Sequence, residues 1–329
     1  MEKPHEQGEI IKERYRIQQT LGQGGMGRVY LADDLRLSGR LCALKAVFYE
    51  EALPEDVIQQ TRGQFQREAN VLARLDHPNL PKVSDYFSIQ NRDYLVMDYV
   101  PGDDLLTKVR EAKRAGEMLS ERDVLNWASQ IAEALIYLHR QEPIILHRDI
   151  KPSNIKLTPD GVIKLVDFGL VKLLASGEKT ITVVHGHGTA YYTPLEQYGG
   201  DTGHTDPRSD VYSFGATLYH LLTLKPPLEA RKRFLNPGEL NSIQDLNPEV
   251  SPRTERAVMA AMGIHPRDRL QNVEDVKEAL LGDWNPIIHP NAALPGPKLR
   301  DFFTGSDQQI MLWLAAVMFM ISVLVTILR

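Results

Sequence analysis

The chain has 329 residues, enough for one large domain or two modest ones with ample apolar material for a core. Its 38 lysines and arginines against 43 aspartates and glutamates give a net charge of -5, with the two signs well mixed, which argues against nucleic acid as a partner. A single cysteine, Cys42, excludes an intrachain disulfide and fits a reducing compartment. Residues 1–17 are charged and lack the apolar core of a signal peptide.

Residues 10–100 are predicted to form short strands around one helix. The strands are β-rich runs separated by glycine-containing turns, and they cover Tyr15–Leu21, Arg28–Ala32, Leu41–Phe48 and Asp93–Val100. The helix is predicted over Gln64–Leu75, because Phe65, Leu72 and Leu75 fall on one face at helical spacing. A small β-rich region is therefore expected at the start of the chain.

The rest of the chain is predicted to follow a different plan. Long helical patterns begin near residue 119 and include Glu121–His139 and Ser209–Leu222. Residues 282–309 are rich in proline and are expected to form an extended linker. The uncharged run Ile310–Leu328 has about 19 residues, which at about 1.5 Å each span about 28 Å, close to the hydrocarbon thickness of a bilayer. It predicts one transmembrane helix, with a buried core helix as the alternative.

A glycine-rich loop joins the first two predicted strands, and its sequence is Gly22-Gln23-Gly24-Gly25-Met26-Gly27-Arg28-Val29. Glycines let a backbone approach phosphates closely and offer unobstructed N–H groups to their oxygens. The same spacing occurs in dinucleotide-binding folds, but there the loop opens a helix, whereas the residues after Gly27 favour a strand. The loop is therefore interpreted as a hairpin that covers phosphates.

Lys45 interrupts an otherwise apolar predicted strand. It could be an ordinary surface lysine on an edge strand. However, Glu68 shares a helix face with Phe65 and Leu72, so its carboxylate is expected to point toward the core. A buried carboxylate is costly unless it is paired, and Lys45 is a fitting partner. Such a pair would hold the lysine ammonium against the phosphates of a nucleotide.

Two acidic motifs follow in the second half of the chain. An apolar run leads into His147-Arg148-Asp149-Ile150-Lys151-Pro152-Ser153-Asn154, and a short predicted hairpin with a turn at Asp160-Gly161 leads into Val166-Asp167-Phe168-Gly169. Two carboxylates and an asparagine suit magnesium–phosphate chemistry, because Mg²⁺ takes hard oxygen ligands and leaves room for phosphate oxygens. Each motif alone is common, but chance agreement of the whole ordered set is negligible.

This ordered set resembles the signature motifs of the eukaryotic-type (Hanks-type) serine/threonine protein kinase family, and the later motifs resemble its bacterial branch. The resemblance covers roughly residues 15–281. It implies an α+β, two-lobed fold, with a small β-rich lobe over about 15–100 and a larger helical lobe over about 101–281. Residues 1–14 would form an N-terminal tail. The implied activity is transfer of the ATP γ-phosphate to serine or threonine hydroxyls of proteins.

The resemblance implies an ATP site formed by the glycine loop, the lysine strand, the helix carboxylate and the segment after the last strand. Its residues are Leu21, Gly22, Gln23, Gly24, Gly25, Met26, Gly27, Val29, Ala43, Lys45, Glu68, Met97, Asp98 and Val100. Lys45 would hold the α- and β-phosphates, and Met97 would be the gatekeeper. Backbone groups of Asp98 and Val100 would bind the adenine edge.

The resemblance also implies the catalytic roles. Asp149 would accept or orient the proton of the substrate hydroxyl, and Lys151 would steady the γ-phosphate. Asn154 and Asp167 would bind Mg²⁺, with Mn²⁺ as an alternative metal. Lys151 and the pair Gly188-Thr189 are typical of serine/threonine rather than tyrosine kinases.

Two supporting contacts and one departure are expected from the family pattern. Asp210 resembles the aspartate that braces the backbone of the catalytic loop, and Arg269 is available to pair with Glu196. The usual Ala-Pro-Glu triplet appears here as Pro194-Leu195-Glu196, so the shape of the substrate pocket near Pro194 stays open.

Regulation and partners are further expectations. Thr180 and Thr182 are candidate phosphosites, since Arg148 would bind a phosphorylated activation loop. The expected partners are serine- or threonine-containing proteins, a lipid bilayer through residues 310–328, and a second copy of the chain for autophosphorylation in trans. The kinase domain would face the cytoplasm from the cell (inner) membrane, because it needs ATP.

Two other functions are alternatives. A pseudokinase would use the same fold as a binding or scaffolding module, but the set of Lys45, Asp149 and Asp167 is complete. A kinase of small molecules such as aminoglycosides would share the two-lobe plan, but it would lack Gly188-Thr189 and the helix pattern that begins at Asp210.

Overall fold

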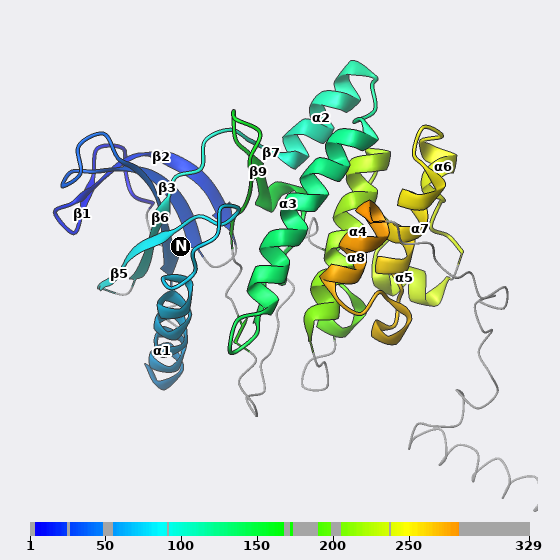
Figure 1. Ribbon diagram of the computed structural model, residues 1–329. Helices are drawn as coiled ribbons and strands as arrows, with labels where there is room; N and C mark the ends of the chain where they lie inside the picture. The colour runs from blue at the N-terminus through cyan, green and yellow to red at the C-terminus, as the bar shows by residue number, and fades with distance from the viewer. Residues whose placement is uncertain are drawn as a thin grey trace, which may run out of the picture. The chain divides into compact units, whose positions relative to one another are not determined.

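The computed structural model describes residues 4–24, 27–48, 55–90, 92–167, 172–173, 190–198, 205–236 and 238–282. A β-rich region comes first in the chain, drawn in blue and cyan in Figure 1, and a helical region follows, drawn in green to orange. The expected α+β architecture of two lobes is confirmed.

Six antiparallel strands form the sheet of the first lobe, in the spatial order β1-β2-β3-β4-β6-β5. Their bounds are Ile10–Ile11 (β1), Tyr15–Gly24 (β2), Gly27–Asp34 (β3), Leu41–Phe48 (β4), Val83–Ile89 (β5) and Arg92–Asp98 (β6). The prediction for β4 is confirmed at both ends. Strand β5 was not predicted, because it lies at the edge of the sheet and polar residues such as Ser84 and Asp85 interrupt its apolar pattern.

The two faces of the sheet bury different sets of side chains. One face carries a cluster that we call the outer cluster, made of Ile11, Tyr15, Ile17, Tyr30, Ala32, Cys42, Leu44, Ala46, Phe87, Tyr94 and Val96. Successive side chains of a strand point to opposite faces. Because Leu44 and Ala46 belong to the outer cluster, Lys45 between them points to the other face, on which helix α1 packs.

Residues 4–14 cover part of the outer cluster. Ile11 is only 6% exposed. The backbone N–H of His5 donates to the Tyr30 hydroxyl at 3.2 Å, and His5 Nε2 lies 2.9 Å from the Tyr94 hydroxyl. His5 Nδ1 also lies 2.8 Å from a carboxylate oxygen of Glu9. This segment, which we call the His5 clasp, is therefore part of the packing of the sheet.

Helix α1 covers Glu55–Leu72 and packs on the inner face of the sheet. The predicted helix is confirmed, but it begins nine residues before Gln64 and ends at Leu72 rather than Leu75. Its buried apolar stripe is Ile58, Phe65, Ala69 and Leu72. The early start was not predicted because Ile58 was overlooked. The helix ends at Leu72 because the next turn is closed by a bond between residues three apart, from the Leu75 N–H to the Leu72 carbonyl at 3.1 Å.

Seven described helices build the second lobe. They are α2 (Leu105–Ala115), α3 (Glu121–His139), α4 (Pro207–Thr223), α5 (Ala230–Leu235), α6 (Ile243–Leu246), α7 (Pro252–Ala261) and α8 (Val273–Leu281). Helix α4 is buried from Ser209 to Thr223, and α3, α7 and α8 contact it (Figure 1). The prediction for α3 is confirmed at both ends, since Ser120 caps its first turn by accepting from the Asp123 N–H.

A short hairpin brings the two acidic motifs together. Strands β9 (Ile155–Leu157) and β10 (Ile163–Leu165) are antiparallel, and Gly161 makes the turn with a φ of 81°, as predicted. The Val166 N–H donates to the Asn154 carbonyl at 2.9 Å. Residue 154, just before β9, and residue 167, just after β10, therefore lie near each other at the open end of the hairpin. Two smaller ladders use β7 (Asp103–Asp104) with β9, and β8 (Ile145–Leu146) with β11 (Lys172–Leu173).

Over the residues that the structure describes, no helix is both long and apolar enough to cross a membrane. The predicted span Ile310–Leu328 and the proline-rich linker before it lie outside the described residues. The transmembrane helix therefore stays a prediction.

Candidate active site

The glycine motif lies on two paired antiparallel strands, as predicted for a hairpin. Gly22 lies opposite Val29 and Gly24 opposite Gly27 in the antiparallel register of β2 and β3, so the loop does not open a helix. A Cβ atom on Gly27 would lie 2.1 Å from the Ala46 carbonyl oxygen, so this glycine is required for strand packing. A Cβ on Gly22 would meet nothing within 4 Å, which leaves its backbone accessible to a ligand. Gly25 and Met26 lie outside the described residues.

Lys45 reaches the second acidic motif. It lies between Val29 of β3 and Leu95 of β6 in the sheet register, and its Nζ lies 2.5 Å from Asp167 Oδ1. The Lys45 ammonium holds the pKa of Asp167 below its usual range, against the opposing effect of burial. Asp167 is therefore ionised at neutral pH and forms an ion pair with Lys45.

Glu68 faces the same place from α1. It is 4% exposed and lines a small cavity of about 20 Å³ together with Lys45, Met97 and Asp167. The structure thus brings the predicted partners Lys45 and Glu68 to one cavity, as the burial argument required. A direct ion pair between them stays a prediction.

The two oxygens of Asp149 have different environments. Oδ2 accepts hydrogen bonds from Lys151 Nζ at 2.7 Å and from Asn154 Nδ2 at 2.8 Å. Oδ1 is buried and has no hydrogen-bond partner among the described residues. A buried acceptor is costly when it is left unsatisfied, so Oδ1 is suited to accept from a ligand hydroxyl. The carboxylate is therefore held in place through Oδ2, and Oδ1 can accept a further hydrogen bond.

Asn154 and Asp167 fit a divalent cation with oxygen ligands. Asn154 Nδ2 donates to Asp149, and Oδ1, on the other side of the amide, accepts from Ser153 Oγ at 3.5 Å. An amide oxygen and a carboxylate are hard ligands of the kind that Mg²⁺ uses beside phosphate oxygens. Within the described ranges, no three histidine, cysteine or acidic side chains gather as a metal cage.

Asp210, at the start of α4, braces the catalytic loop as predicted. Its carboxylate accepts from the backbone N–H groups of His147 and Arg148, each at 2.8 Å. His139, the last residue of α3, donates to it through Nε2 at 2.9 Å. Burial raises the pKa of Asp210, but the hydrogen bond and charge of His139 outweigh this effect and hold the pKa below its usual value. His139 was not predicted from the sequence, because its only signal is a polar residue at the end of an apolar helix.

With this geometry in place, comparison with known proteins assigns the family. Residues 15–269 match the protein kinase domain family.

The chain belongs to that family. A probable serine/threonine-protein kinase of Clostridium acetobutylicum is 34% identical over 290 residues, which are 86% of this chain and 42% of that protein. A probable serine/threonine-protein kinase of Streptomyces coelicolor is 36% identical over 289 residues, with coverages of 83% and 41%. The kinase domain of Mycobacterium tuberculosis PknI aligns with a TM-score of 0.62 at 28% identity, covering 84% of this chain and 98% of that one. This kinase chain thus spans about two fifths of the length of the two curated relatives.

Arg148 adopts a left-handed backbone conformation, with a φ of 65°, directly before Asp149, the predicted catalytic aspartate. Its side chain donates to the Thr205 hydroxyl, and its Nε has no partner among the described residues. Burial lowers the pKa of Arg148, while the charges of Asp210 and Glu68 act in the opposite direction. The candidate phosphosites Thr180 and Thr182 lie outside the described residues, so their contact with Arg148 stays a prediction.

The departure from Ala-Pro-Glu does not disturb the predicted ion pair of the kinase lobe. Arg269 binds both carboxylate oxygens of Glu196, at 2.6 and 2.9 Å, and its side chain is fully buried. Ser209 Oγ donates to the same carboxylate at 2.9 Å. The predicted Glu196–Arg269 bridge is therefore confirmed, and it fastens the segment that contains Pro194 to α4.

The segment at the end of β6 carries the residues that are predicted to contact adenine. Met97, the predicted gatekeeper, lies opposite Ala43, another predicted ATP-site residue, in the register of β6 and β4. The Asp98 N–H donates to the Lys82 carbonyl at 2.9 Å. The adenine contacts of Asp98 and Val100 stay a prediction. Val100 is 7% exposed.

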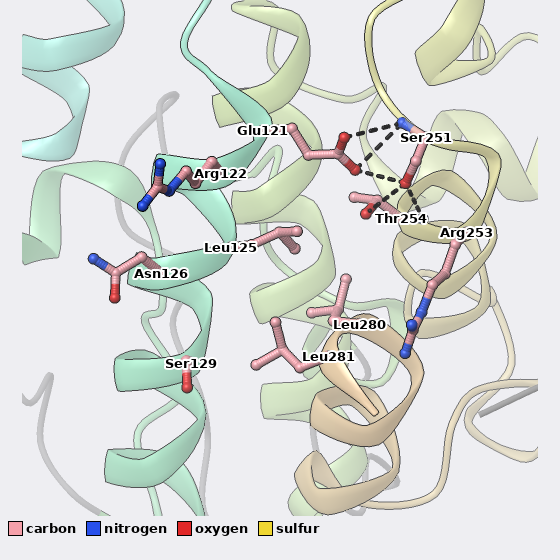
Figure 2. A pocket seen from close by; sticks show the side chains of 10 residues that line it. All are labelled: Glu121, Arg122, Leu125, Asn126, Ser129, Ser251, Arg253, Thr254, Leu280 and Leu281. Atoms are coloured by element: carbon pink, nitrogen blue, oxygen red, sulfur yellow. Dashed lines mark hydrogen bonds between the residues drawn. The ribbon is translucent and has the colours of Figure 1, made fainter. Parts of the chain in front are cut away.

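A larger hollow of about 590 Å³ lies away from this chemistry, between α3, α7 and α8 (Figure 2). In it Glu121 accepts from the N–H and hydroxyl of Ser251, and the remaining lining is mostly neutral polar or leucine side chains. No residue of the predicted kinase site takes part in it.

Proposed function

We propose that this chain is a serine/threonine protein kinase that transfers the γ-phosphoryl group of ATP to hydroxyls of protein substrates. The observation that carries the proposal is the asymmetric environment of Asp149, with Oδ2 held by Lys151 and Asn154 and Oδ1 without a partner among the described residues. A general base must be fixed in place and still have an oxygen free for the substrate proton. Asp149 meets both requirements.

The chain's own residues contribute mainly position and charge, which is what phosphoryl transfer needs. Asp149 Oδ1 would accept the hydrogen of the substrate hydroxyl, and Lys151 would stay close enough to contact the phosphoryl group. Lys45, held by Asp167, would bind the phosphates from the sheet side. Mg²⁺ bound at Asn154 and Asp167 would neutralise phosphate charge.

A radiolabelled ATP assay tests this function. The full-length chain is incubated with labelled ATP, Mg²⁺ or Mn²⁺, and dephosphorylated casein, beside Asp149→Asn as the inactive control. We expect labelled phosphoserine or phosphothreonine with the wild type only. Absence of label with both metals would favour the pseudokinase alternative, and label on kanamycin but not on casein would favour the small-molecule kinase.

The membrane attachment is a second part of the proposal, supported by the sequence of Ile310–Leu328. This run has no charged residue, its length matches a bilayer, and Trp313 lies near one end, where aromatic side chains favour the interface. Since the kinase domain needs ATP, it would lie on the cytoplasmic side. Serine- or threonine-containing proteins at the cell membrane would be the substrates, and a second copy could phosphorylate Thr180 or Thr182.

A further inference from the structure

The connection between β3 and β4, residues 35–40, is a closed turn. The Asp34 N–H donates to the Arg40 carbonyl at 3.0 Å, and the Arg40 N–H donates to the Leu37 carbonyl at 2.9 Å. Gly39 adopts a φ of 80°, a left-handed conformation that glycine accommodates without strain. The backbone of Arg40 is therefore held in place directly before the first residue of β4.

The side chain of Arg40 lies between two carboxylates. Its Nη2 donates to Asp98 Oδ1 at 3.1 Å, and its Nη1 lies 3.6 Å from Asp34 Oδ2. Asp98 is the last residue of β6, where the chain leaves the sheet. Arg40 thus joins the β3–β4 turn to a residue that is predicted to contact adenine.

Asp34 anchors this arrangement from inside the lobe. It is 2% exposed, and Arg14, directly before β2, donates to both of its carboxylate oxygens, at 2.8 and 2.7 Å. These hydrogen bonds hold the pKa of Asp34 below its usual range, against the opposing effect of burial. The ionised carboxylate holds one side of the Arg40 guanidinium, so the other side is presented to Asp98.

The backbone of Asp98 lies at the end of a strand ladder. It is opposite Cys42 in the last pair between β6 and β4, and its N–H donates to the Lys82 carbonyl at 2.9 Å. The ion pair with Arg40 adds a restraint at the residue where the pairing of β6 with β4 ends. A backbone that is already held in its binding conformation loses less freedom when a ligand binds, which favours affinity.

We infer that Arg40 is a positioning residue for the nucleotide, which holds the side chain of Asp98 and so sets the Asp98 backbone for its contact with adenine. The inference rests on the proposed kinase function and its predicted adenine contact at Asp98. It assigns to Arg40 an effect on the affinity for the nucleotide, and none on the binding of the protein substrate.

Nucleotide binding by the full-length chain tests the inference. Isothermal titration calorimetry with ADP and Mg²⁺ measures Kd without any need for phosphate transfer. Arg40→Ala should raise the Kd for ADP about two- to fivefold, the size expected for loss of one partly exposed ion pair. The KM for casein should not change.

A double-mutant cycle separates the two carboxylate partners of Arg40. In a chain that carries Asp98→Ala, the further change Arg40→Ala should leave the Kd for ADP unaltered, because the ion pair is already absent. If Arg40 acted only by supporting the β3–β4 turn through Asp34, the further change would raise the Kd as much as it does in the wild type. That result would overturn the inference.

Arg16→Ala is the matched control. Arg16 forms an ion pair with Asp33 at 3.0 Å on the same sheet, and this pair does not involve β6, so the Kd for ADP should stay at the wild-type value. An unchanged Kd in Arg40→Ala, or an equal rise in Arg16→Ala, would overturn the inference. A wild-type chain that binds ADP but transfers no phosphate would overturn the kinase function alone, and one that binds no ADP would overturn both.

Discussion

Lys45 Nζ and Asp167 Oδ1 lie 2.5 Å apart although 122 positions separate the two residues in the sequence. The contact joins β4 of the sheet to the end of the β9–β10 hairpin. The fold thus brings together the lysine that is predicted to bind phosphates and the carboxylate that is predicted to bind a metal ion.

Loss of either charge should abolish most of the turnover. Lys45→Met and Asp167→Asn remove groups that act by position and charge, so casein phosphorylation should fall by about 100-fold or more, with melting temperatures close to the wild type. Lys82→Met is the control, because the Lys82 side chain forms an exposed pair with Asp76 at 3.5 Å. Near-normal turnover in either site variant would show that its role is assigned wrongly.

Autophosphorylation is expected on Thr180, Thr182 or both. A phosphate there would gain charge-assisted hydrogen bonds from Arg148, which lies directly before Asp149. Mass spectrometry of the wild type should find the phosphate, and the Asp149→Asn chain expressed in the same way should lack it. The prediction fails if both threonines are unmodified in a chain that phosphorylates casein.

The Glu196–Arg269 bridge should contribute far more to the free energy of unfolding than an exposed ion pair does. Arg269→Leu leaves a carboxylate in a mostly buried place, so the free energy of unfolding should fall by about 3–5 kcal/mol. Arg267→Leu is the matched control: its pair with Asp268 is exposed, and it should cost at most about 1 kcal/mol. Urea unfolding measures both. If Arg269→Leu does not fold, Glu196→Gln provides the comparison, and a loss no larger than that of Arg267→Leu would contradict the prediction.

Stability should depend on pH through His220. Its pKa falls from 6.5 in the unfolded chain to about 4 in the folded one. Below about pH 6.5 the His220 side chain binds a proton in the unfolded state, but in the folded state it does so only near pH 4. Lowering the pH through this window therefore reduces the free energy of unfolding. Above about pH 6.5 this group no longer reduces the free energy of unfolding. The loss between about pH 7 and about pH 5.5 is about 1 kcal/mol from this group. Urea unfolding of His220→Asn should show a smaller acid effect by that amount, and an unaltered pH dependence would contradict the prediction.

The membrane anchor predicts a simple fractionation result. The full-length protein should stay in the membrane pellet after a carbonate wash, because an inserted apolar helix is not released by high pH. A chain ending at Gly282 should appear in the supernatant and still phosphorylate casein. Release of the full-length protein by carbonate would refute the anchor.

Local sequence patterns predicted the elements that have a strong period and clear ends. Leu41–Phe48 and Glu121–His139 match at both ends, because each has an apolar pattern that stops at a turn or a cap. The start of α1 was missed because Ile58 stands apart from the other apolar residues of its stripe.

The residues that carry the chemistry of the site were easier to predict than the residues that hold them in place. Asp149, Lys151 and Asn154 come within hydrogen-bond distance of one another because they share one loop. The contacts of His139 with Asp210 and of His220 with Tyr192 join distant segments, and no local pattern specifies them. Such pairs depend on how helices pack and become visible only in three dimensions.

The His5 clasp affects the choice of the N-terminal boundary for a recombinant kinase domain. A shortened chain that starts at Tyr15, where the family match begins, would lose the hydrogen-bond partners of Tyr30 and Tyr94. It would also expose an aromatic stack in which the rings of Phe87 and Tyr94 lie 4.9 Å apart. Recombinant domains trimmed to the family boundary should therefore aggregate more readily than domains that begin at or before Pro4.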